Sequence, residues 1–471
     1  MPGPGNVGER VRNLRLTRRL SQAQLAGHDL SDSYISLIES GKRTPTPTVL
    51  RMLAERLGCT PEYLAEGVEP EQRAHLEVRE RHAHLALLSG DAVTAEAGFD
   101  EVIARSDDPD LTSRARSGRA RALEELGRTD EAIALFEELR EQAERDPGRV
   151  SWLPPVSALA RCYHLVGDLG QAIALAERAL ARLRELGLSG GREHTEIGRV
   201  LLLAYVDRSE AERAHELGRT LLGPGASEGD DPSVQYRRAS TRALDEGAIG
   251  DSLHLADQAL AAWHGETPVR AQARLNLAGA RALLRGVPPF ASEWQEPSDA
   301  TAAKAAEEAV ALLRAAASGL EGEEATESTI EQARALVLLG EPERAISVLE
   351  EFLDAGMALA PPGGIADIAP QPGDDLAVRI RKTAQARLVL ARARLAQSDA
   401  TAALVVLRAA AGQLDGLPPG RPAANVFREM GELFEAAGDF DGATASYRQA
   451  LEAAGLRHAR PQTASCDFGL V

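Results

Sequence analysis

The feature that most constrains this chain is a spacing that recurs along most of its length. A glycine or serine is followed by a small residue five positions later, by a second side chain four positions after that, and by a third after three more. Eight copies begin at Gly90, Gly127, Gly167, Ser209, Gly247, Gly340, Ser398 and Gly438. A ninth fits from Gly286 to Ala302 if the proline-rich segment 287–299 is an insertion. Such self-similarity predicts a repeat array rather than a single core.

The residue types in this spacing point to paired helices. Glycine or serine suits the turn between two helices, and the small residue after it lets them approach closely. Aromatic residues make up only 4% of the chain, which favours small-residue helix packing over an aromatic-rich sheet. We therefore predict an all-α fold, with an α-solenoid of about nine helix pairs over residues 71–460. The turn-rich stretch 361–375 is expected to join copies seven and eight, and residues 461–471 to form a flexible tail.

The repeated pattern resembles the tetratricopeptide repeat (TPR). Most copies are spaced 37–42 residues apart, somewhat more than the standard spacing of about 34 residues. The resemblance implies a superhelix whose concave groove is lined by the first helix of each pair. Two positions per copy, ten and six residues before the turn residue, are then expected to face this groove.

Arginine is several times more frequent at these groove positions than the composition predicts. The candidate ligand-binding residues are Arg121, Arg161, Arg199, Arg237, Asn276, Arg334, Arg392 and Arg428. In a chain of net charge −18, an inner ladder of arginines suggests an anionic ligand, such as a peptide carboxylate or another small anion. The alternative is that these arginines pair with glutamates of neighbouring helices and stiffen the stack. For Asn276 a plain structural role is the alternative.

Residues 1–67 differ from the rest of the chain in charge and in pattern. They carry a net charge of +2, whereas the remainder carries −20. Helix starts divide this segment into five short helices: Ser21 and Gln24 form a capping box, Ser31 can cap a third helix, and Thr46-Pro47 and Thr60-Pro61 open the last two. Two short helices with a tight join inside such a bundle are what a helix-turn-helix requires.

Two strings in this segment carry a family resemblance. Leu20–Ala26 and Ser31–Arg43, followed by Pro45 and Leu57-Gly58, resemble the Xre/Cro–phage-repressor helix-turn-helix family. The resemblance implies a DNA-binding domain over residues 1–67. The join at 27–30 is one residue shorter than usual and lacks the customary glycine before the cap, which would tilt the recognition helix.

The resemblance also implies roles for single residues. Groove-facing positions that would meet base edges are Asp32, Ser33, Ser36 and Leu37. Positions that would lie beside phosphates and set the register are Gln22, Tyr34, Lys42 and Arg43. Plainer interpretations stay open, in which Ser36 and Tyr34 are ordinary surface residues and Asp32 only caps its helix. Arg15 and Glu39 match a family pair that forms a structural ion pair.

The sequence gives no sign of an enzyme or a metal site. Phosphate-binding loops, the nucleophile motif Gly-x-Ser-x-Gly and the zinc motif His-Glu-x-x-His are absent, so we expect no catalytic residues and no cofactor. Cys59, Cys162 and Cys466 have neither zinc nor disulfide spacing. No apolar run is long enough to span a bilayer, and the start shows no secretory pattern. We therefore predict a cytoplasmic protein without a membrane partner.

The combination of the two segments resembles bacterial helix-turn-helix regulators with TPR arrays, including those controlled by small secreted peptides. It implies a sequence-specific transcription regulator that binds double-stranded DNA as a homodimer on a palindromic operator. The array would sense a ligand and hold the dimer together. The alternative is a TPR scaffold that binds a protein partner, with DNA binding secondary.

Overall fold

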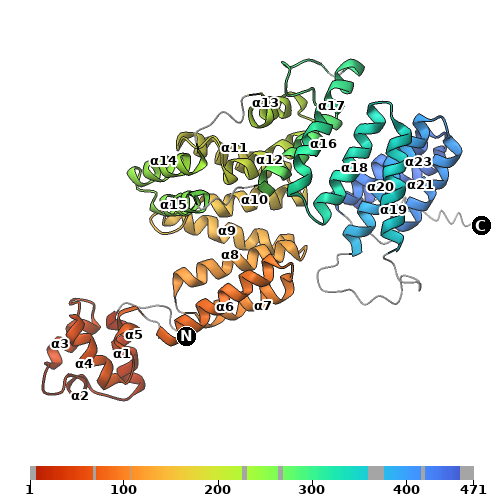
Figure 1. The fold of residues 1–471 in the computed structure, drawn as a ribbon. Coiled ribbons are helices and arrows are strands. Elements are labelled where there is room, and N and C mark those ends of the chain that lie inside the picture. Colours follow the sequence, from red (N-terminus) through yellow and green to blue (C-terminus); the bar gives the residue numbers. More distant parts are fainter. Residues whose placement is uncertain are drawn as a thin grey trace, which may run out of the picture. The chain divides into compact units, whose positions relative to one another are not determined.

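The computed structural model describes residues 7–66, 70–106, 108–224, 231–263, 269–296, 298–358, 376–414 and 420–456. Every regular element in these ranges is a helix, as predicted (Figure 1). The chain forms two compact units, residues 1–139 and 140–471, and each is described by itself. The predicted domain boundary at 67–71 and the predicted tail 461–471 remain predictions, because residues 67–69 and 457–471 lie outside the described ranges.

A search of the described helices for candidate membrane spans found none that is both long enough and apolar enough.

The N-terminal segment folds as five short helices. They are α1 (Val7–Thr17), α2 (Gln22–Ala26), α3 (Asp32–Glu39), α4 (Pro47–Leu57) and α5 (Pro61–Glu66). The predicted capping box is confirmed: the Gln24 amide N–H donates to the Ser21 hydroxyl at 3.1 Å, and the Ser21 N–H donates to the Gln24 side chain at 2.7 Å. Ser31, Thr46 and Thr60 cap the later helices as expected. These caps fix where each helix begins, and so which residues α3 exposes.

Nine helix pairs follow within the described part of the chain, as the repeat count predicts. The first four are α6 (Pro70–Leu88) with α7 (Ala92–Arg105), α8 (Pro109–Glu125) with α9 (Thr129–Arg145), α10 (Leu153–Val166) with α11 (Leu169–Glu185), and α12 (Arg192–Asp207) with α13 (Ala211–Leu222). The others are α14 (Pro232–Asp245) with α15 (Ile249–Trp263), α16 (Val269–Leu284) with α17 (Asp299–Ala316), α18 (Glu323–Leu338) with α19 (Pro342–Ala358), α20 (Leu376–Ala396) with α21 (Ala400–Leu414), and α22 (Arg421–Ala436) with α23 (Phe440–Ala453).

The nine predicted turn residues share one backbone conformation. All have a positive φ between 62° and 94°, including the two serines, Ser209 and Ser398, each at 62°. Small residues five positions later are buried in eight of the pairs, as expected for close helix approach. Copy six is the exception, because Ala302 is exposed in the first turn of α17 and only the later alanines Ala306 and Ala309 are buried.

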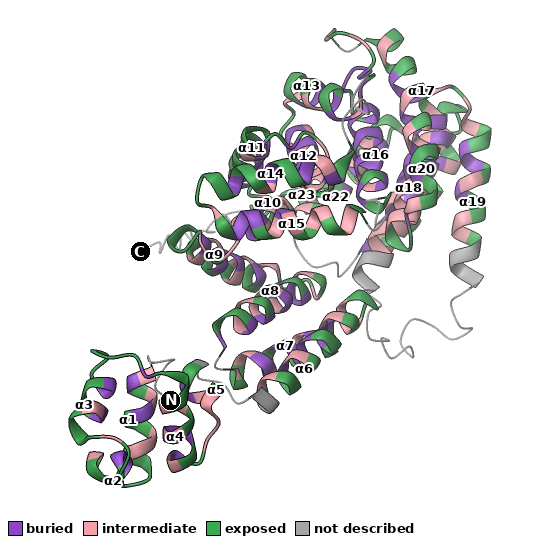
Figure 2. Cartoon of the chain, turned by 60° about the vertical axis from the view of Figure 1, so that its left-hand side comes forward, coloured by how far each residue is buried: buried purple, intermediate pink, exposed green. Residues whose placement is uncertain are grey.

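The order in which the pairs stack departs from their order along the chain. The first helices of successive pairs lie side by side from α18 to α20 to α22, but α16 packs against α12 and not against the pair that precedes it in sequence (Figure 1). Both α12 and α16 are therefore buried along much of their length (Figure 2). The fifth pair, α14–α15, therefore does not lie between the fourth and sixth pairs.

The fifth pair is instead anchored to residues that precede α10 and α12. The Gly250 N–H donates to the Pro147 carbonyl at 2.9 Å, and a Cβ on Gly250 would lie 2.4 Å from the backbone of Val150. The buried Asp251 carboxylate accepts from the Trp152 N–H at 2.9 Å and from the Ser151 hydroxyl at 2.7 Å. Asp251 thus caps α10, whose own N-cap residue supplies no side-chain hydrogen bond.

The predicted insertion between α16 and α17 is a folded segment. Phe290 is fully buried, and its ring lies 2.2 Å from where a Cβ on Gly218 would be. His215 contacts this segment at the Pro288 carbonyl, 3.2 Å from its Nδ1, and at the Trp294 ring. The insertion therefore packs against α13 and fills the layer between α13 and α16.

Candidate DNA-binding surface and ligand groove

The helix α3 presents the predicted base-reading residues to solvent. Asp32, Ser33 and Ser36 are exposed, and Leu37 is 38% exposed although it is a large apolar residue. On the opposite face, Ile35 and Ile38 are buried in the core of the five helices. The exposed face matches the predicted groove-facing side, although its contact with bases is a prediction that no finding tests.

The predicted ion pair between Arg15 and Glu39 is confirmed. The Arg15 Nε lies 2.6 Å from Glu39 Oε1, and both side chains are largely buried. Gln22, predicted to lie beside a phosphate, donates from its side-chain amide to Glu39 Oε2 at 2.8 Å. Burial raises the pKa of Glu39, but the hydrogen bonds from Arg15 and Gln22 outweigh it and lower the pKa overall. These contacts tie α1, α2 and α3 together at the start of α2.

The remaining candidate phosphate contacts lie at the two ends of α3. The Arg43 guanidinium stacks over the Tyr34 ring, 5.1 Å from its centroid. Lys42 and Arg43 are exposed, and their N–H groups donate to the Leu37 carbonyl. Two cations are thus held close to the exposed face of α3.

Sequence reasoning missed the residue that supports the short join between α2 and α3. Arg56, on α4, donates to the carbonyls of Leu25 and Ala26 and forms an ion pair with Asp29 in the join. Gly27 has a φ of 62°, and a Cβ there would contact the Arg56 guanidinium. Arg56 therefore satisfies the last carbonyls of α2 in a join that lacks the usual glycine before its cap.

The candidate groove residues differ in their surroundings. Four of them form ion pairs with glutamates: Arg199, Arg334, Arg392 and Arg428. Asn276 is buried, and its side-chain oxygen accepts from Gln272 at 3.1 Å, in line with a structural role. Arg121 is exposed on α8 and Arg161 is half-buried on α10. Arg237 is exposed on α14 and has no ion-pair or hydrogen-bond partner for its guanidinium among the described residues.

Two of these arginines belong to a larger group that we call the central charge cluster. Its members are the basic side chains of Arg281, Arg285, Arg334, Lys382 and Arg392 and the acidic side chains of Glu327, Glu331 and Glu429. Arg281 lies on α16 and Arg285 directly follows it, and the other members lie on the first helices α18, α20 and α22. Arg281 forms an ion pair with Glu327, Arg334 lies 2.6 Å from Glu429, and Lys382 lies 2.8 Å from Glu327.

The central charge cluster holds more positive than negative charge. Five cations face three carboxylates, which leaves an excess of two positive charges. Burial raises the pKa of Glu327, but the charges of Arg281 and Lys382 outweigh it and hold the pKa at about 2. The pKa of Arg285 is lowered, first by burial and then by the charge of Arg281. The Glu327 carboxylate is therefore ionised at neutral pH, and burial disfavours the charge of Arg285.

Two donors in the central charge cluster also lack hydrogen bonds. The Nε atoms of Arg281 and Arg392 are buried and have no hydrogen-bond partner among the described residues, whereas the Arg334 Nε lies 3.3 Å from Glu331 Oε2. A buried donor without an acceptor costs about 1–3 kcal/mol. Excess positive charge and buried donors without hydrogen bonds distinguish the central charge cluster from the Arg15–Glu39 pair.

The basic residues Arg281, Arg285 and Lys382 were not among the predicted groove residues. Arg281 and Arg285 lie five residues and one residue before the turn residue Gly286, outside the two positions per copy that the resemblance assigns to the groove. The one available signal was the four-residue spacing of Arg281, in the last turn of α16, and Arg285, which directly follows the helix.

Comparisons with known sequence families match both predicted segments. Residues 11–64 match the helix-turn-helix family, and residues 81–148 and 156–188 match tetratricopeptide repeat families. The predicted combination of an Xre-type helix-turn-helix with TPR repeats is therefore confirmed. A search of the curated proteins found no match.

Three solved structures illustrate the structural similarity. PlcR from Bacillus thuringiensis, in complex with the peptide PapR7 and DNA, is 16% identical over 66% of this chain and 95% of its own, with a TM-score of 0.30. The apo form of the quorum sensor NprR from B. thuringiensis is 12% identical over 95% and 99%, with a TM-score of 0.46. A Rap protein complexed with Competence and Sporulation Factor is 11% identical over 81% and 97%, with a TM-score of 0.41. Scores this low carry no functional argument.

Proposed function

We propose that this chain, which joins a helix-turn-helix domain to tetratricopeptide repeats, is a sequence-specific DNA-binding transcription regulator whose array senses an anionic ligand. The observation that carries the DNA-binding part is the exposed face of α3 in a domain that matches the helix-turn-helix family. An acidic chain repels nucleic acid except where a segment is shaped for it. The five-helix segment, with its net charge of +2, is such a segment.

Within this proposal the exposed residues of α3 read the DNA. Ser33 and Ser36 hydrogen-bond to base edges, Leu37 contacts a thymine methyl, and Asp32 accepts from a cytosine amino group. Lys42 and Arg43 contact phosphates and set the register. Gln22 acts mainly through Glu39, because its amide is held by that carboxylate.

The domain works as a dimer in this proposal. One small module makes few phosphate contacts, whereas two modules spaced by a turn of the double helix read a palindrome and bind more tightly. A regulator of this kind acts in the cytoplasm, where bacterial DNA lies.

The decisive test is binding of fragmented genomic DNA by the purified protein at two salt concentrations. We expect a small set of fragments that share a palindrome and survive the higher salt, because base contacts add to the salt-sensitive phosphate contacts. The variant S33A/S36A should lose its preference for the palindrome. The loss in binding free energy should be about 1–3 kcal/mol for each good base contact that is removed. Glu62→Gln, exposed on α5, is the matched control and should retain it. Diffuse binding that disappears with salt would overturn the proposal.

The ligand part of the proposal depends on the excess charge of the central charge cluster. Citrate serves as a simple polyanionic probe, with tryptophan fluorescence as the readout, since Trp152, Trp263 and Trp294 all lie in residues 140–471. We expect citrate to raise the unfolding temperature, and Arg334→Met to abolish the rise. Arg344→Met removes an exposed arginine of α19 that pairs with Glu341, outside the candidate ligand-binding set, and should leave the rise intact. An equal rise in both variants would mean that citrate acts elsewhere.

Ligand binding is proposed to act on DNA affinity through the shape of the array. The four first helices that carry the central charge cluster belong to four different pairs, so an anion between them would change how these pairs sit against one another. Operator affinity measured with and without the bound anion tests this coupling. Equal affinities at saturation would contradict it.

The second candidate is a scaffold whose array binds a protein partner, with DNA binding secondary. It is favoured by the glutamate partners of four groove arginines, which leave part of the ladder structural. Under this alternative, changing Ser33, Ser36 and Lys42 together leaves the cellular phenotype intact. Under the regulator proposal, the phenotype is lost.

A further inference from the structure

In a stacked array, one face of a helix pair is covered by the pair that follows, and we call this face the stacking face. Its positions on the second helix lie 6, 9, 13 and 16 residues after the turn residue. In the third pair these positions are Ile173, Ala176, Leu180 and Leu183, and their exposed fractions are 4%, 0%, 3% and 0%. The following helix α12 packs against α11 and accounts for this burial.

The fifth pair has the same apolar positions but leaves them open. Its stacking face consists of Leu253, Ala256, Leu260 and Trp263. Leu253 and Leu260 are each 59% exposed and Trp263 is 76% exposed. The cause is the stacking order, since α16 packs against α12 and leaves α15 without a following pair. Apolar side chains in this arrangement are expected to be covered by something else.

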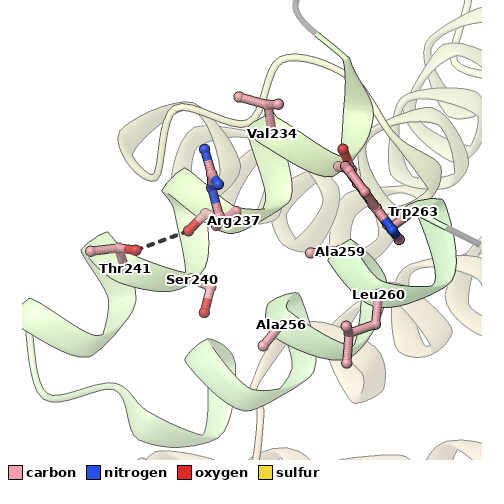
Figure 3. Close-up of a pocket in the computed structure, with 9 residues that line it drawn as sticks. Val234, Arg237, Ser240, Thr241, Ala256, Ala259, Leu260 and Trp263 are labelled. Carbon is pink, nitrogen blue, oxygen red and sulfur yellow. Dashed lines mark hydrogen bonds between the residues drawn. The ribbon is translucent and has the colours of Figure 1, made fainter.

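A cavity of about 390 Å³ extends this face between α14 and α15 (Figure 3). Ala256, Ala259, Leu260 and Trp263 line it from α15, and Arg237 lies at its rim on α14. The exposed Asp257 on α15 has no partner among the described residues, as is true of Arg237. Arg237 thus brings a positive charge to the cavity, and Asp257 brings a negative charge to the helix that carries the open apolar side chains.

We propose that the stacking face of α14–α15 is covered by the same face of a second copy of this chain, which forms the dimer interface. This inference rests on the proposed function in one respect, the need for two DNA-binding domains. The apolar residues of α15, Ile249, Leu253, Ala256, Leu260 and Trp263, alternate at spacings of four and three residues. This is the spacing of a helix that packs along another helix.

A two-fold axis suits this stripe. Two antiparallel copies of α15 place Ala256, the middle residue of the stripe, opposite its own counterpart, and the larger side chains pair on either side. Each copy brings the cation of Arg237 on α14 and the carboxylate of Asp257 on α15, so these two residues add no net charge to the interface. A small residue at the centre lets the helices approach closely, as the buried alanines do elsewhere in the array.

The proposal is tested by sedimentation of the full-length chain. We expect a dimer that Leu260→Glu dissociates, with a dissociation constant raised by about 100-fold or more, because the variant places a carboxylate in an apolar contact. Val405→Glu is the matched control: Val405 is 66% exposed on α21, and its substitution should leave the dimer unchanged. Ala256→Cys should give a disulfide-linked dimer on oxidation, and the wild-type chain, with its native cysteines, gives the background.

The outcomes separate this inference from the proposed function. A monomeric wild-type chain, or a dimer that survives Leu260→Glu and gives no cross-link at position 256, overturns the interface. If the same wild-type chain still selects a palindrome, the regulator proposal stands. Dissociation by Leu260→Glu in a chain that binds no specific DNA supports the interface and overturns the regulator.

Discussion

The Arg15–Glu39 pair of the helix-turn-helix domain and the central charge cluster of the array are both networks of partly or wholly buried charge. The first is balanced: Arg15 donates to both oxygens of the Glu39 carboxylate, and Gln22 also donates to Oε2. The second has five cations for three carboxylates and leaves donors unsatisfied. A balanced ion pair stabilises the fold, whereas a network with more cations than carboxylates would bind an added anion favourably.

The difference also shows in how the two networks are assembled. Arg15 and Glu39 lie 24 residues apart within one small domain, so their contact forms as the domain folds. Arg334 and Glu429 lie 95 residues apart on different helix pairs and meet only when the array is stacked. The Arg15–Glu39 pair therefore depends only on the folding of the helix-turn-helix domain, whereas the central charge cluster depends on how the helix pairs of the array stack.

Removing Glu39 should give the largest effect. Glu39→Ala leaves Arg15 buried without its partner and should lower the free energy of unfolding of the helix-turn-helix domain by about 3–5 kcal/mol. Hydrogen exchange of residues 7–66 in the full-length chain measures the loss. The double variant R15L/E39L should recover most of the stability, because neither charge is then left alone. A small effect of Glu39→Ala would mean that the pair is not structural.

The second prediction separates the two regions by pH. Burial and the charge of Arg184 lower the pKa of His194, on α12, to about 4 from an ordinary value near 6.5. On acidification, His194 takes up a proton in the unfolded chain before it does so in the folded chain. The free energy of unfolding is therefore unaffected by His194 above pH 6.5. It falls between pH 6.5 and about 4, by about 3 kcal/mol at most.

Tryptophan fluorescence should record this loss in residues 140–471 as the pH falls from 6.5 to 4. His194→Gln should flatten the pH dependence in this window. The helix-turn-helix network should respond at lower pH, since the pKa of Glu39 is lowered below its ordinary value by Arg15 and Gln22 despite burial. A slope that persists in His194→Gln would assign the effect to another group.

Much of this fold was predictable because short-range sequence patterns determine its turns and helix caps. The turn positions could be found even where serine replaces glycine, as at Ser209 and Ser398, because each repeat carries its own turn and small residues. The cap at Ser21 and the Arg15–Glu39 pair were predictable for similar reasons, one from spacing and one from family resemblance.

The remaining features depend on contacts between distant residues. The repeat spacing does not predict that α16 packs against α12. The pattern within each pair fixes which of its faces are apolar, but not which other pair covers them. The cap that Asp251 supplies to the Trp152 N–H spans 99 residues and has no local signal. For the same reason the arginine ladder could be predicted, but its glutamate partners and the added cations of α16 and α20 could not.

The smallest effect tests the imbalance of the central charge cluster directly. Glu429→Gln removes a carboxylate that Arg334 and Arg392 share, and should lower the free energy of unfolding by about 1–2 kcal/mol. Arg392→Met removes one of the surplus cations and should change the free energy of unfolding by less than about 0.5 kcal/mol in either direction. Urea unfolding followed by tryptophan fluorescence measures both. In a balanced network the two losses would be equal, and equal losses would place the central charge cluster in the same class as the Arg15–Glu39 pair.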